Sequence, residues 1–235
     1  MQRRIQGAVN VDLEYTEVGE NALFEGDIVL ATAADARAAA LGAESKSIGI
    51  IGAQYRWQDG TVAYVAEEAL RPKVKAAIEH WQSRTPFKFV PRTNEVDFIS
   101  FERRDGCWSR VGRQGGKQVI SLGPGCGLGS AIHEIGHAIG LWHEQSRSDR
   151  DDFIEIIWDN IDDQFAHNFD KHIQDGQDFG AYDHGSIMHY PENAFSKNQQ
   201  PTIRAKNGTP IGQRNGLSDG DVAGLKLMYP DLPWA

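Results

Sequence analysis

Apolar positions recur with two different periods in the first half of the chain, and both predict regular elements ahead of residue 127. The segments "FKFVPR" and "VDFISFE" alternate apolar and polar residues, as half-buried strands do. The stretch "YRWQDGTVAYVAEE" reads as two strands about an Asp59-Gly60 turn. Between them, residues 71–85 carry apolar side chains at helical spacing, which is typical of a helix packed on a core. The positions on that face are Val74, Ala77, Ile78 and Trp81.

The rest of the chain is less regular. After about residue 144 it is richer in Asp, Asn, Gln and Gly until "LSDGDVAGLKLMYP", where Ser218 and Asp221 form a capping box for a short closing helix that Pro230 ends. The N-terminal region looks too thin to fold alone, and residues 31–47 resemble a partly helical, cleavable connector. We therefore expect an α+β protein with one core, or two lobes around a cleft, and an N-terminal appendage.

The composition of the chain limits the kinds of partner that we expect it to bind. The 235 residues are 40% hydrophobic, enough for a substantial core, and carry a formal net charge of −9 with no cluster of Lys and Arg. We therefore expect no nucleic acid partner. No run approaches the roughly 20 apolar residues that cross a bilayer, so we expect no membrane partner. The first residues lack the apolar segment of a secretion signal, and we expect such a leader to be missing from the sequence.

The two cysteines bear on the compartment. Cys107 and Cys126 flank two strand-like halves around Gly115-Gly116, and a hairpin there would bring its ends together. A disulfide predicts an exported protein, since such bonds persist in oxidising compartments. Two buried free thiols in a cytosolic protein are the alternative.

Candidate metal ligands gather in "SAIHEIGHAIGLWHEQ". On a helix, His133 and His137 project from one face and can hold one ion. Gly140 can end that helix in a left-handed conformation and return the chain so that His143 becomes a third ligand. Three imidazoles suit Zn²⁺ and leave a position for water, as in a catalytic site, and Glu134 beside them is a general base for that water. The alternative, a surface helix with coincidental histidines, does not explain the spacing of Gly140 and His143.

The stretch "SIMHYPENAF" adds two residues. A methionine at a turn beneath a three-histidine site is the mark of metzincin proteases, and Met188 fits it, although an ordinary core residue would look the same. Tyr190 could bind zinc through its phenolate or hydrogen-bond a developing oxyanion, with a surface tyrosine as the alternative.

With these motifs, the chain resembles the astacin family of zinc endopeptidases from about Ile48 to Tyr229. The resemblance is carried by "HEIGHAIGLWHEQ", "CWSRVGRQGGKQVISLGPGC", "SIMHY" and "IGQRNGLSDGDVAGLKLMY". It implies a two-lobed metzincin fold, with a twisted, mostly parallel sheet and the active-site helix in the upper lobe and an irregular lower lobe. It also implies one catalytic zinc on His133, His137 and His143, Glu134 as general base, and Tyr190 as a switching fifth ligand.

The resemblance extends to latency. Pro-segments of the family carry a Phe-x-Gly-Asp motif whose aspartate binds zinc, and "FEGD" at residues 24–27 matches it. It implies that Asp27 blocks the metal, with Gly26 allowing close approach of the backbone; a plain surface turn is the alternative. We expect an inhibitory pro-segment at residues 1–47 and a catalytic domain at residues 48–235.

Activation follows the same analogy. Cleavage after Lys46 by a trypsin-like activating protease would create a new terminus near Ser47 to Gly49. The resemblance implies that the ammonium of this terminus pairs through water with Glu144, for which a solvated charge is the alternative.

Substrate binding is expected at two places. Arg214 matches a position where some astacins favour Asp or Glu after the scissile bond, and a surface arginine is the alternative. Residues near Trp108 and Ser109 should offer an edge strand to an extended protein or peptide substrate. We thus predict a secreted, monomeric zinc endopeptidase captured as its precursor. An inert zinc-containing binding protein and a thermolysin-like enzyme, with glutamate instead of His143 on the metal, are the competing hypotheses.

Overall fold

A computed structural model describes residues 3–6, 12–32, 52–171 and 176–234. Its upper lobe is built on a twisted five-stranded sheet of order β6-β5-β7-β9-β8. All neighbours in this sheet are parallel except β8 and β9, so the predicted mostly parallel sheet is confirmed. The strands are β5 (Thr61–Ala66), β6 (Lys88–Pro91), β7 (Phe98–Glu102), β8 (Cys107–Trp108) and β9 (Lys117–Leu122).

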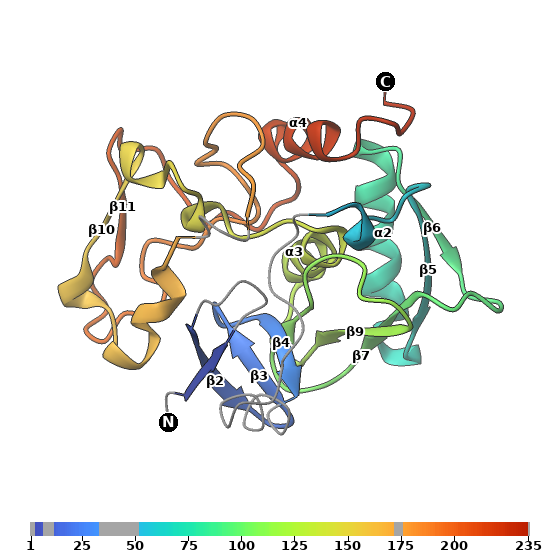
Figure 1. Ribbon diagram of the computed structural model, residues 1–235, viewed down its shortest axis with the longest axis horizontal. Coiled ribbons are helices and arrows are strands. Elements are labelled where there is room, and N and C mark those ends of the chain that lie inside the picture. Colours follow the sequence, from blue (N-terminus) through green and yellow to red (C-terminus); the bar gives the residue numbers. More distant parts are fainter. Residues whose placement is uncertain (1–2, 7–11, 33–51, 172–175, 235) are drawn as a thin grey trace.

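Two helices pack together and against this sheet (Figure 1). Helix α2 (Arg71–Arg84) buries the four predicted positions Val74, Ala77, Ile78 and Trp81. The Nε1–H of Trp81 donates to the carbonyl of Ile132, 3.1 Å away, on helix α3 (Leu128–Ile139). Because α3 is buried along nearly its whole length, it is fixed between the sheet and the rest of the molecule, which makes it a rigid support for a site.

The predicted hairpin about Asp59-Gly60 is wrong, since only its second strand forms. Residues Ala53–Tyr55 make a 3₁₀ turn (η1) instead. Trp57 is buried and its Nε1–H donates to the carbonyl of Ala138, 2.9 Å away at the end of α3. This long-range packing overrides the local hairpin pattern, and β5 pairs with β6 and β7 instead.

The cysteine hairpin is confirmed with its disulfide. Cys107 pairs with Leu122 across β8 and β9, and glycines 115 and 116 turn the chain with φ of +79° and +64°. The bond joins Cys107 to Cys126, whose Cα atoms are 5.8 Å apart, and closes a separation of 19 residues. A loop of this size corresponds to about 3 kcal/mol of stabilisation.

The lower lobe is largely irregular, as predicted. Its described residues contain one antiparallel pair, β10 (Ile154–Ile156) and β11 (Ile203–Ala205), and four short 3₁₀ helices. These helices are η3 (Glu144–Ser146), η4 (Arg150–Asp152), η5 (Trp158–Asn160) and η6 (Asp163–Phe169). This lobe has an apolar cluster of its own. Helix α4 (Asp219–Met228) then returns to the upper core, with the predicted capping box of Ser218 and Asp221.

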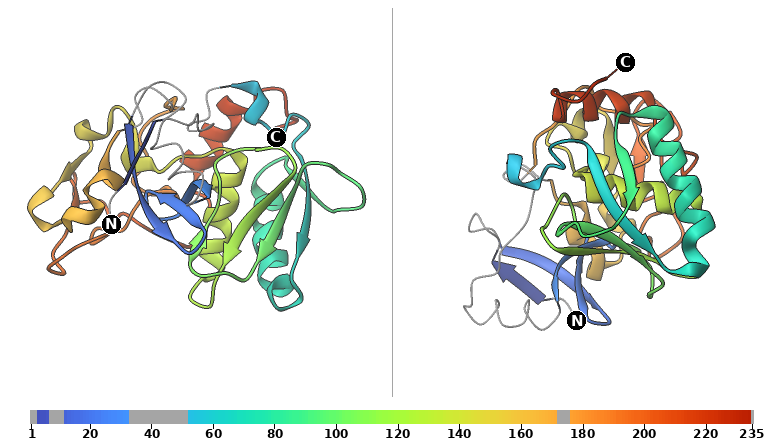
Figure 2. Two further views of the ribbon diagram at one scale, coloured as in Figure 1. Left: turned by 60° about the horizontal axis from the view of Figure 1, so that its bottom comes forward. Right: turned by 90° about the vertical axis from the view of Figure 1, so that its right-hand side faces the viewer.

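The N-terminal region folds as a four-stranded antiparallel sheet, which the sequence pattern did not lead us to expect. Its strands are β1 (Arg3–Gln6), β2 (Asp12–Val18), β3 (Asn21–Phe24) and β4 (Ile28–Thr32), in that order. Figures 1 and 2 show this sheet between the upper sheet and the β10–β11 lobe. The predicted connector beyond residue 32 and the predicted cleavage site lie outside the described residues.

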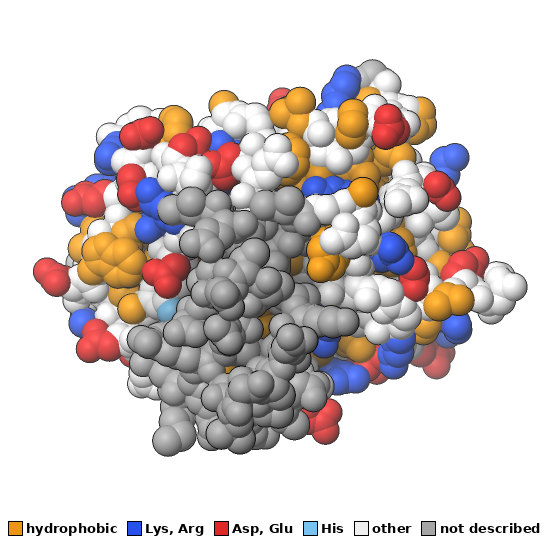
Figure 3. Space-filling view, in the orientation of Figure 1, with side chains coloured by type: hydrophobic (Ala, Val, Ile, Leu, Met, Phe, Trp, Pro, Cys, Tyr) orange, Lys and Arg blue, Asp and Glu red, His pale blue; other side chains and the backbone are white. Residues whose placement is uncertain are grey.

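Charged side chains of both signs are spread over one face of the molecule (Figure 3). On the face shown in Figure 3, acidic and basic side chains of the described residues are interspersed on both sides of the central region. Within the described ranges, no helix has the length and apolar character needed to cross a membrane.

Candidate metal centre

The three predicted histidines are delivered by one helix and the turn that follows it. His133 and His137 lie one turn apart on α3, and the helix ends at Gly140, whose φ is +126°. The Gly140 N–H donates to the carbonyls of Gly136 and His137, which closes the helix. Since a φ in this range suits glycine, Gly140 lets the chain fold back and place His143 beside the other two imidazoles.

Asp27 completes a compact cluster with these histidines. One ligand atom from each of Asp27, His133, His137 and His143 lies within 4.8 Å of the others. The Nε2 atoms of His133 and His143 are 3.3 Å apart, and Asp27 carboxylate oxygens lie 3.3 Å and 3.2 Å from them. Nitrogen ligands at about 2.0–2.1 Å from a tetrahedral zinc would be about 3.3 Å apart, so the spacing fits that ion.

Hydrogen bonds at the other ring nitrogens orient all three imidazoles. The Nδ1 atoms of His133 and His137 lie 2.9 Å and 2.8 Å from the carbonyls of Ile187 and Leu141. The Nδ1 of His143 lies 2.8 Å from a carboxylate oxygen of Glu25. A carbonyl or carboxylate can only accept, so each Nδ1 carries the proton and each Nε2 presents a lone pair to the cluster.

The Nε2 lone pairs of the three histidines need a cation to balance them. The Nε2 atoms of His133 and His143 face each other without a proton between them, and the Nε2 of His137 is buried without a hydrogen-bond partner among the described residues. Orphaned buried acceptors are destabilising unless an ion or a donor meets them. The donor set of three imidazoles and one carboxylate therefore fits zinc.

The charge on Asp27 follows from the same geometry. Burial raises the pKa of Asp27, but when the imidazoles are protonated their charges, that of His143 above all, and the hydrogen bonds from His133 and His143 outweigh burial and hold this pKa well below its usual range. Asp27 is therefore anionic, and its carboxylate can serve as an oxygen ligand beside the three imidazoles.

Glu134 points into the cavity beside the cluster. Its side chain is buried, and its Oε2 has no hydrogen-bond partner among the residues that the structure describes. Burial first, and then the Asp27 carboxylate, raise the pKa of Glu134 well above its usual range, against the opposing charge of Arg214. Glu134, Asp27, Tyr190 and Arg214 line one cavity of about 350 Å³.

Met188 lies beneath the helix, in the position that its motif predicts. A Cβ built on Gly136 would be 2.7 Å from the Met188 sulfur, so the helix and the methionine turn approach each other closely. The Met188 carbonyl accepts from the Glu144 N–H at 3.2 Å. Sequence reasoning missed Gly136, although a glycine between two ligands on a helix is a signal of close packing.

Tyr190 contacts the N-terminal segment in this structure. Its ring centroid is 4.6 Å from that of His143, and its hydroxyl donates to the Glu25 carbonyl. A role as a fifth ligand would require this hydrogen bond to break.

Each residue of the "FEGD" segment has its own contact. The Phe24 ring packs on Trp142 and His167, with centroids 6.5 Å and 6.4 Å away. A Cβ on Gly26 (φ +84°) would lie 2.6 Å from the Phe195 ring, so only glycine fits there. Sequence reasoning assigned Asp27 but missed Glu25, Ser146 and Phe195, since these partners are far apart in the chain.

The backbone after this segment pairs with the edge of the upper sheet. The Ser109 N–H donates to the Asp27 carbonyl at 2.9 Å, and the Val29 N–H donates to the Ser109 carbonyl at 2.8 Å. Ile28 and Ser109 form a parallel bridge, next to Trp108 in β8. The N-terminal segment therefore covers the edge that we predict to bind an extended substrate.

Arg214 also lines the cavity beside the cluster. Its Nη1 donates to the carbonyls of Ile187 and His189 at 2.8 Å and 3.0 Å, whereas Nη2 and Nε make no hydrogen bond to any described residue. A Cβ on Gly129 would lie 2.0 Å from the Arg214 carbonyl, so α3 packs tightly against this backbone. The Arg214 guanidinium is therefore fixed in position, and its Nη2 and Nε donors are available to a ligand.

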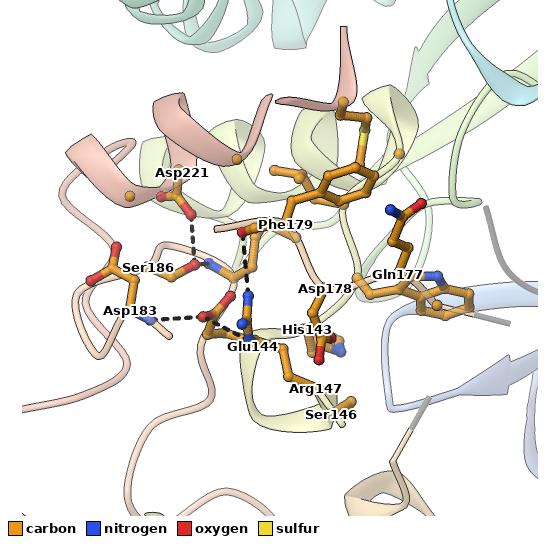
Figure 4. A pocket seen from close by; sticks show the side chains of 18 of the residues that line it. His143, Glu144, Ser146, Arg147, Gln177, Asp178, Phe179, Asp183, Ser186 and Asp221 are labelled. Atoms are coloured by element: carbon orange, nitrogen blue, oxygen red, sulfur yellow. Dashed lines mark hydrogen bonds and ion pairs between the residues drawn. The ribbon is translucent and has the colours of Figure 1, made fainter. Parts of the chain in front are cut away.

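His143 lines a second cavity (Figure 4), with a volume of about 80 Å³. Glu144 lines it, accepts from the Asp183 N–H at 2.8 Å and lies 3.7 Å from the Arg147 guanidinium. Burial raises the pKa of Glu144 to about 8, partly offset by the Asp183 N–H and Arg147. Asp221 also lines this cavity, which is therefore rich in acidic groups.

Comparisons with known proteins agree with this geometry. The chain is 37% identical over 223 residues to zinc metalloproteinase nas-13 of Caenorhabditis elegans, which covers 88% of this chain and 50% of that protein. It is 39% identical over 218 residues to human meprin A subunit beta, covering 88% of this chain and 29% of that protein. The chain thus spans half or less of the length of these two relatives.

A solved structure shares the fold over nearly its whole length. High choriolytic enzyme 1, a hatching enzyme zinc-protease from the medaka fish Oryzias latipes, matches with a TM-score of 0.73 and 36% identity. The match covers 78% of this chain and 98% of that one.

Three histidines on a helix and its following turn, above a methionine turn, define the metzincin class of zinc metallopeptidases. The family model described as Astacin, a peptidase family, matches residues 50–230. The chain belongs to the astacin family, a family that uses one catalytic zinc.

Proposed function

We propose that this chain is the latent precursor of a secreted zinc-dependent endopeptidase. The observation that carries the proposal is the convergence of three Nε2 lone pairs on one point, with the Glu134 carboxylate on the same helix. Its relatives named as metalloproteinase and zinc-protease support the same activity. The Cys107–Cys126 disulfide supports an oxidising, exported setting.

Glu134 is the general base in this proposal. His133, His137 and His143 would hold the zinc ion, which would supply a Lewis acid for the attacking water and for the peptide carbonyl. Glu134 takes the proton of the attacking water and passes it to the leaving amine, since its carboxylate lines the cavity with an oxygen left unpaired by the described residues. Tyr190, once released from the Glu25 carbonyl, can reach the metal or donate to the developing oxyanion.

Residues 1–47 hold the enzyme latent. Asp27 would fill the coordination position of the zinc ion that catalysis needs, and residues 27–29 use the edge hydrogen bonds of Ser109 that an extended substrate would use. The tight fit of Gly26 on Phe195 supports a segment built for this cleft. Residues 48–235 then form the catalytic domain, with peptides and an activating protease as its partners.

The cavity lined by Glu144 would receive the new amino terminus after activation. Cleavage near residues 46–49 frees an amino terminus, and an ammonium group would be met there by Glu144, beside Asp183 and Asp221. Such pairing would favour the charged form of Glu144, which burial disfavours in the precursor. The proposed contact of the new terminus with Glu144 requires cleavage at the proposed domain boundary.

Limited trypsin treatment of the zinc-loaded chain, with the new terminus identified by mass spectrometry, tests the proposed activity. We expect peptide hydrolysis to appear with cleavage near residues 46–49, to disappear on treatment with 1,10-phenanthroline, and to return with added Zn²⁺. A correctly cleaved chain that holds zinc and stays inert would instead be a peptide-binding protein.

Arg214 is expected to favour Asp or Glu after the scissile bond. Its unpaired Nη2 and Nε can donate to a substrate carboxylate, and hydrogen bonds to charged groups contribute about 1.5–3 kcal/mol. Arg214→Ala should therefore lower the kcat/KM ratio of acidic to alanine-containing peptides by roughly 10- to 100-fold. Paired fluorogenic peptides that differ at this one residue measure the ratio, in which a general loss of activity cancels.

The exposed Arg204 on β11 offers the matched control, because Arg204→Ala removes the same charge far from the cavity. An unchanged ratio in Arg214→Ala would leave Arg214 with a purely structural part, through its bonds to the Ile187 and His189 carbonyls.

A further inference from the structure

One of the three candidate zinc ligands is oriented by the N-terminal segment and not by the catalytic domain. His133 and His137 receive their Nδ1 partners from Ile187 and Leu141, which remain in the domain after cleavage. The partner of His143 is the Glu25 carboxylate, 118 residues away in sequence. Cleavage and release of the segment would therefore take away the orienting group of His143 alone.

The Glu25 contact is buried and made at several points. Both side chains, Glu25 and His143, are fully buried. The second carboxylate oxygen of Glu25 accepts from the Ser146 hydroxyl, and its carbonyl accepts from the Tyr190 hydroxyl. Glu25 has φ +51°, a conformation that few non-glycine residues adopt, so these contacts hold it in an unusual backbone geometry.

A carboxylate at this place is a stronger partner than a carbonyl. Hydrogen bonds to an ionised acceptor are roughly twice as strong as neutral ones, and a carboxylate behind a ligating histidine raises the basicity of its metal-binding nitrogen. Loss of such a partner typically lowers metal affinity by roughly 10- to 100-fold.

We propose that Glu25 is a positioning residue for His143. Through this contact the N-terminal segment strengthens zinc binding by the catalytic domain, in addition to the direct contact of Asp27 with the metal ligands. The inference rests on the proposed latency. Linkage makes the effect mutual: a segment that strengthens zinc binding is itself bound more strongly when zinc is present. The latent chain is then the form best able to acquire and keep the metal.

Zinc affinity of the intact, uncleaved chain tests this assignment. In competition with a chromogenic chelator, Glu25→Ala should bind Zn²⁺ roughly 10- to 100-fold more weakly than wild type. Glu25→Gln, which keeps an acceptor oxygen without the charge, should lie between the two. Glu20→Gln removes an exposed carboxylate from the turn before β3 and should bind zinc as wild type does.

Ser146→Ala separates positioning from folding. This change removes the hydroxyl that fixes the other Glu25 oxygen, so it should weaken zinc binding in the uncleaved chain and leave the released domain unchanged. Equal losses in both forms, or wild-type affinity in Glu25→Ala, would overturn the proposal. Zinc affinity can be measured without substrate turnover. A chain that binds zinc but does not hydrolyse peptides would therefore refute the proposed activity and leave the proposal for Glu25 unaffected.

Discussion

Replacing Glu134 by Gln should lower kcat/KM of the activated chain by roughly 10²- to 10⁴-fold, the range typical of general acid-base catalysis. Gln keeps the size and position of the side chain but cannot accept the proton of the attacking water. Because Glu134 is not one of the four clustered ligand residues, the variant should bind Zn²⁺ as tightly as the parent. Initial rates with a fluorogenic peptide, together with metal content, check both statements.

Glu155→Gln is the matched control for this change. Glu155 is an exposed carboxylate on β10 whose ion pair with Arg204 spans 3.5 Å, so its loss should alter kcat/KM by no more than about twofold. A Glu134→Gln enzyme with near-parent activity would remove this residue from the mechanism, and one that had lost its zinc would show that the carboxylate holds the site together.

Replacing Asp27 by Ala should make the uncleaved chain active. The Asp27 carboxylate lies 3.3 Å and 3.2 Å from the Nε2 atoms of His133 and His143, and removing one partner of a buried ionic contact costs about 3–5 kcal/mol. Such a change corresponds to roughly 10²- to several thousand-fold more chains with an open site. Activity per zinc-loaded molecule should rise accordingly, before any cleavage.

The experiment needs a chain that cannot mature. Lys46→Gln at the predicted cleavage site keeps the segment attached, so activity in the Asp27→Ala, Lys46→Gln double variant comes from the intact chain, as a gel confirms. Asp27→Asn should open the site less than Asp27→Ala, because an amide oxygen still ligates weakly, and Glu20→Gln should remain latent. Latency equal to that of the parent in Asp27→Ala would mean that strand pairing at Ser109 blocks the cleft by itself.

Local patterns in the sequence predicted what local geometry determines. Two imidazoles one turn apart, a glycine that ends the helix, and a capping box are short-range features, and α3, Gly140 and α4 follow them. The buried face of α2 was predicted for the same reason, since helical spacing alone defines it.

Contacts between distant segments were not predictable in this way. The Trp57 hydrogen bond spans 81 residues and replaced an expected strand, and the Glu25–His143 contact spans 118. The N-terminal sheet has one signal in the sequence. Gly19, with φ +60°, lies in the tight turn between β2 and β3.

The parallel bridge between Ile28 and Ser109 has a consequence for the protein before it ever meets a substrate. Strand β8 is the last strand of its sheet, and unpaired strand edges invite cross-chain β-pairing and aggregation. By covering that edge, residues 27–29 shield it from pairing with a second chain. Release of the segment would expose this edge together with the cleft.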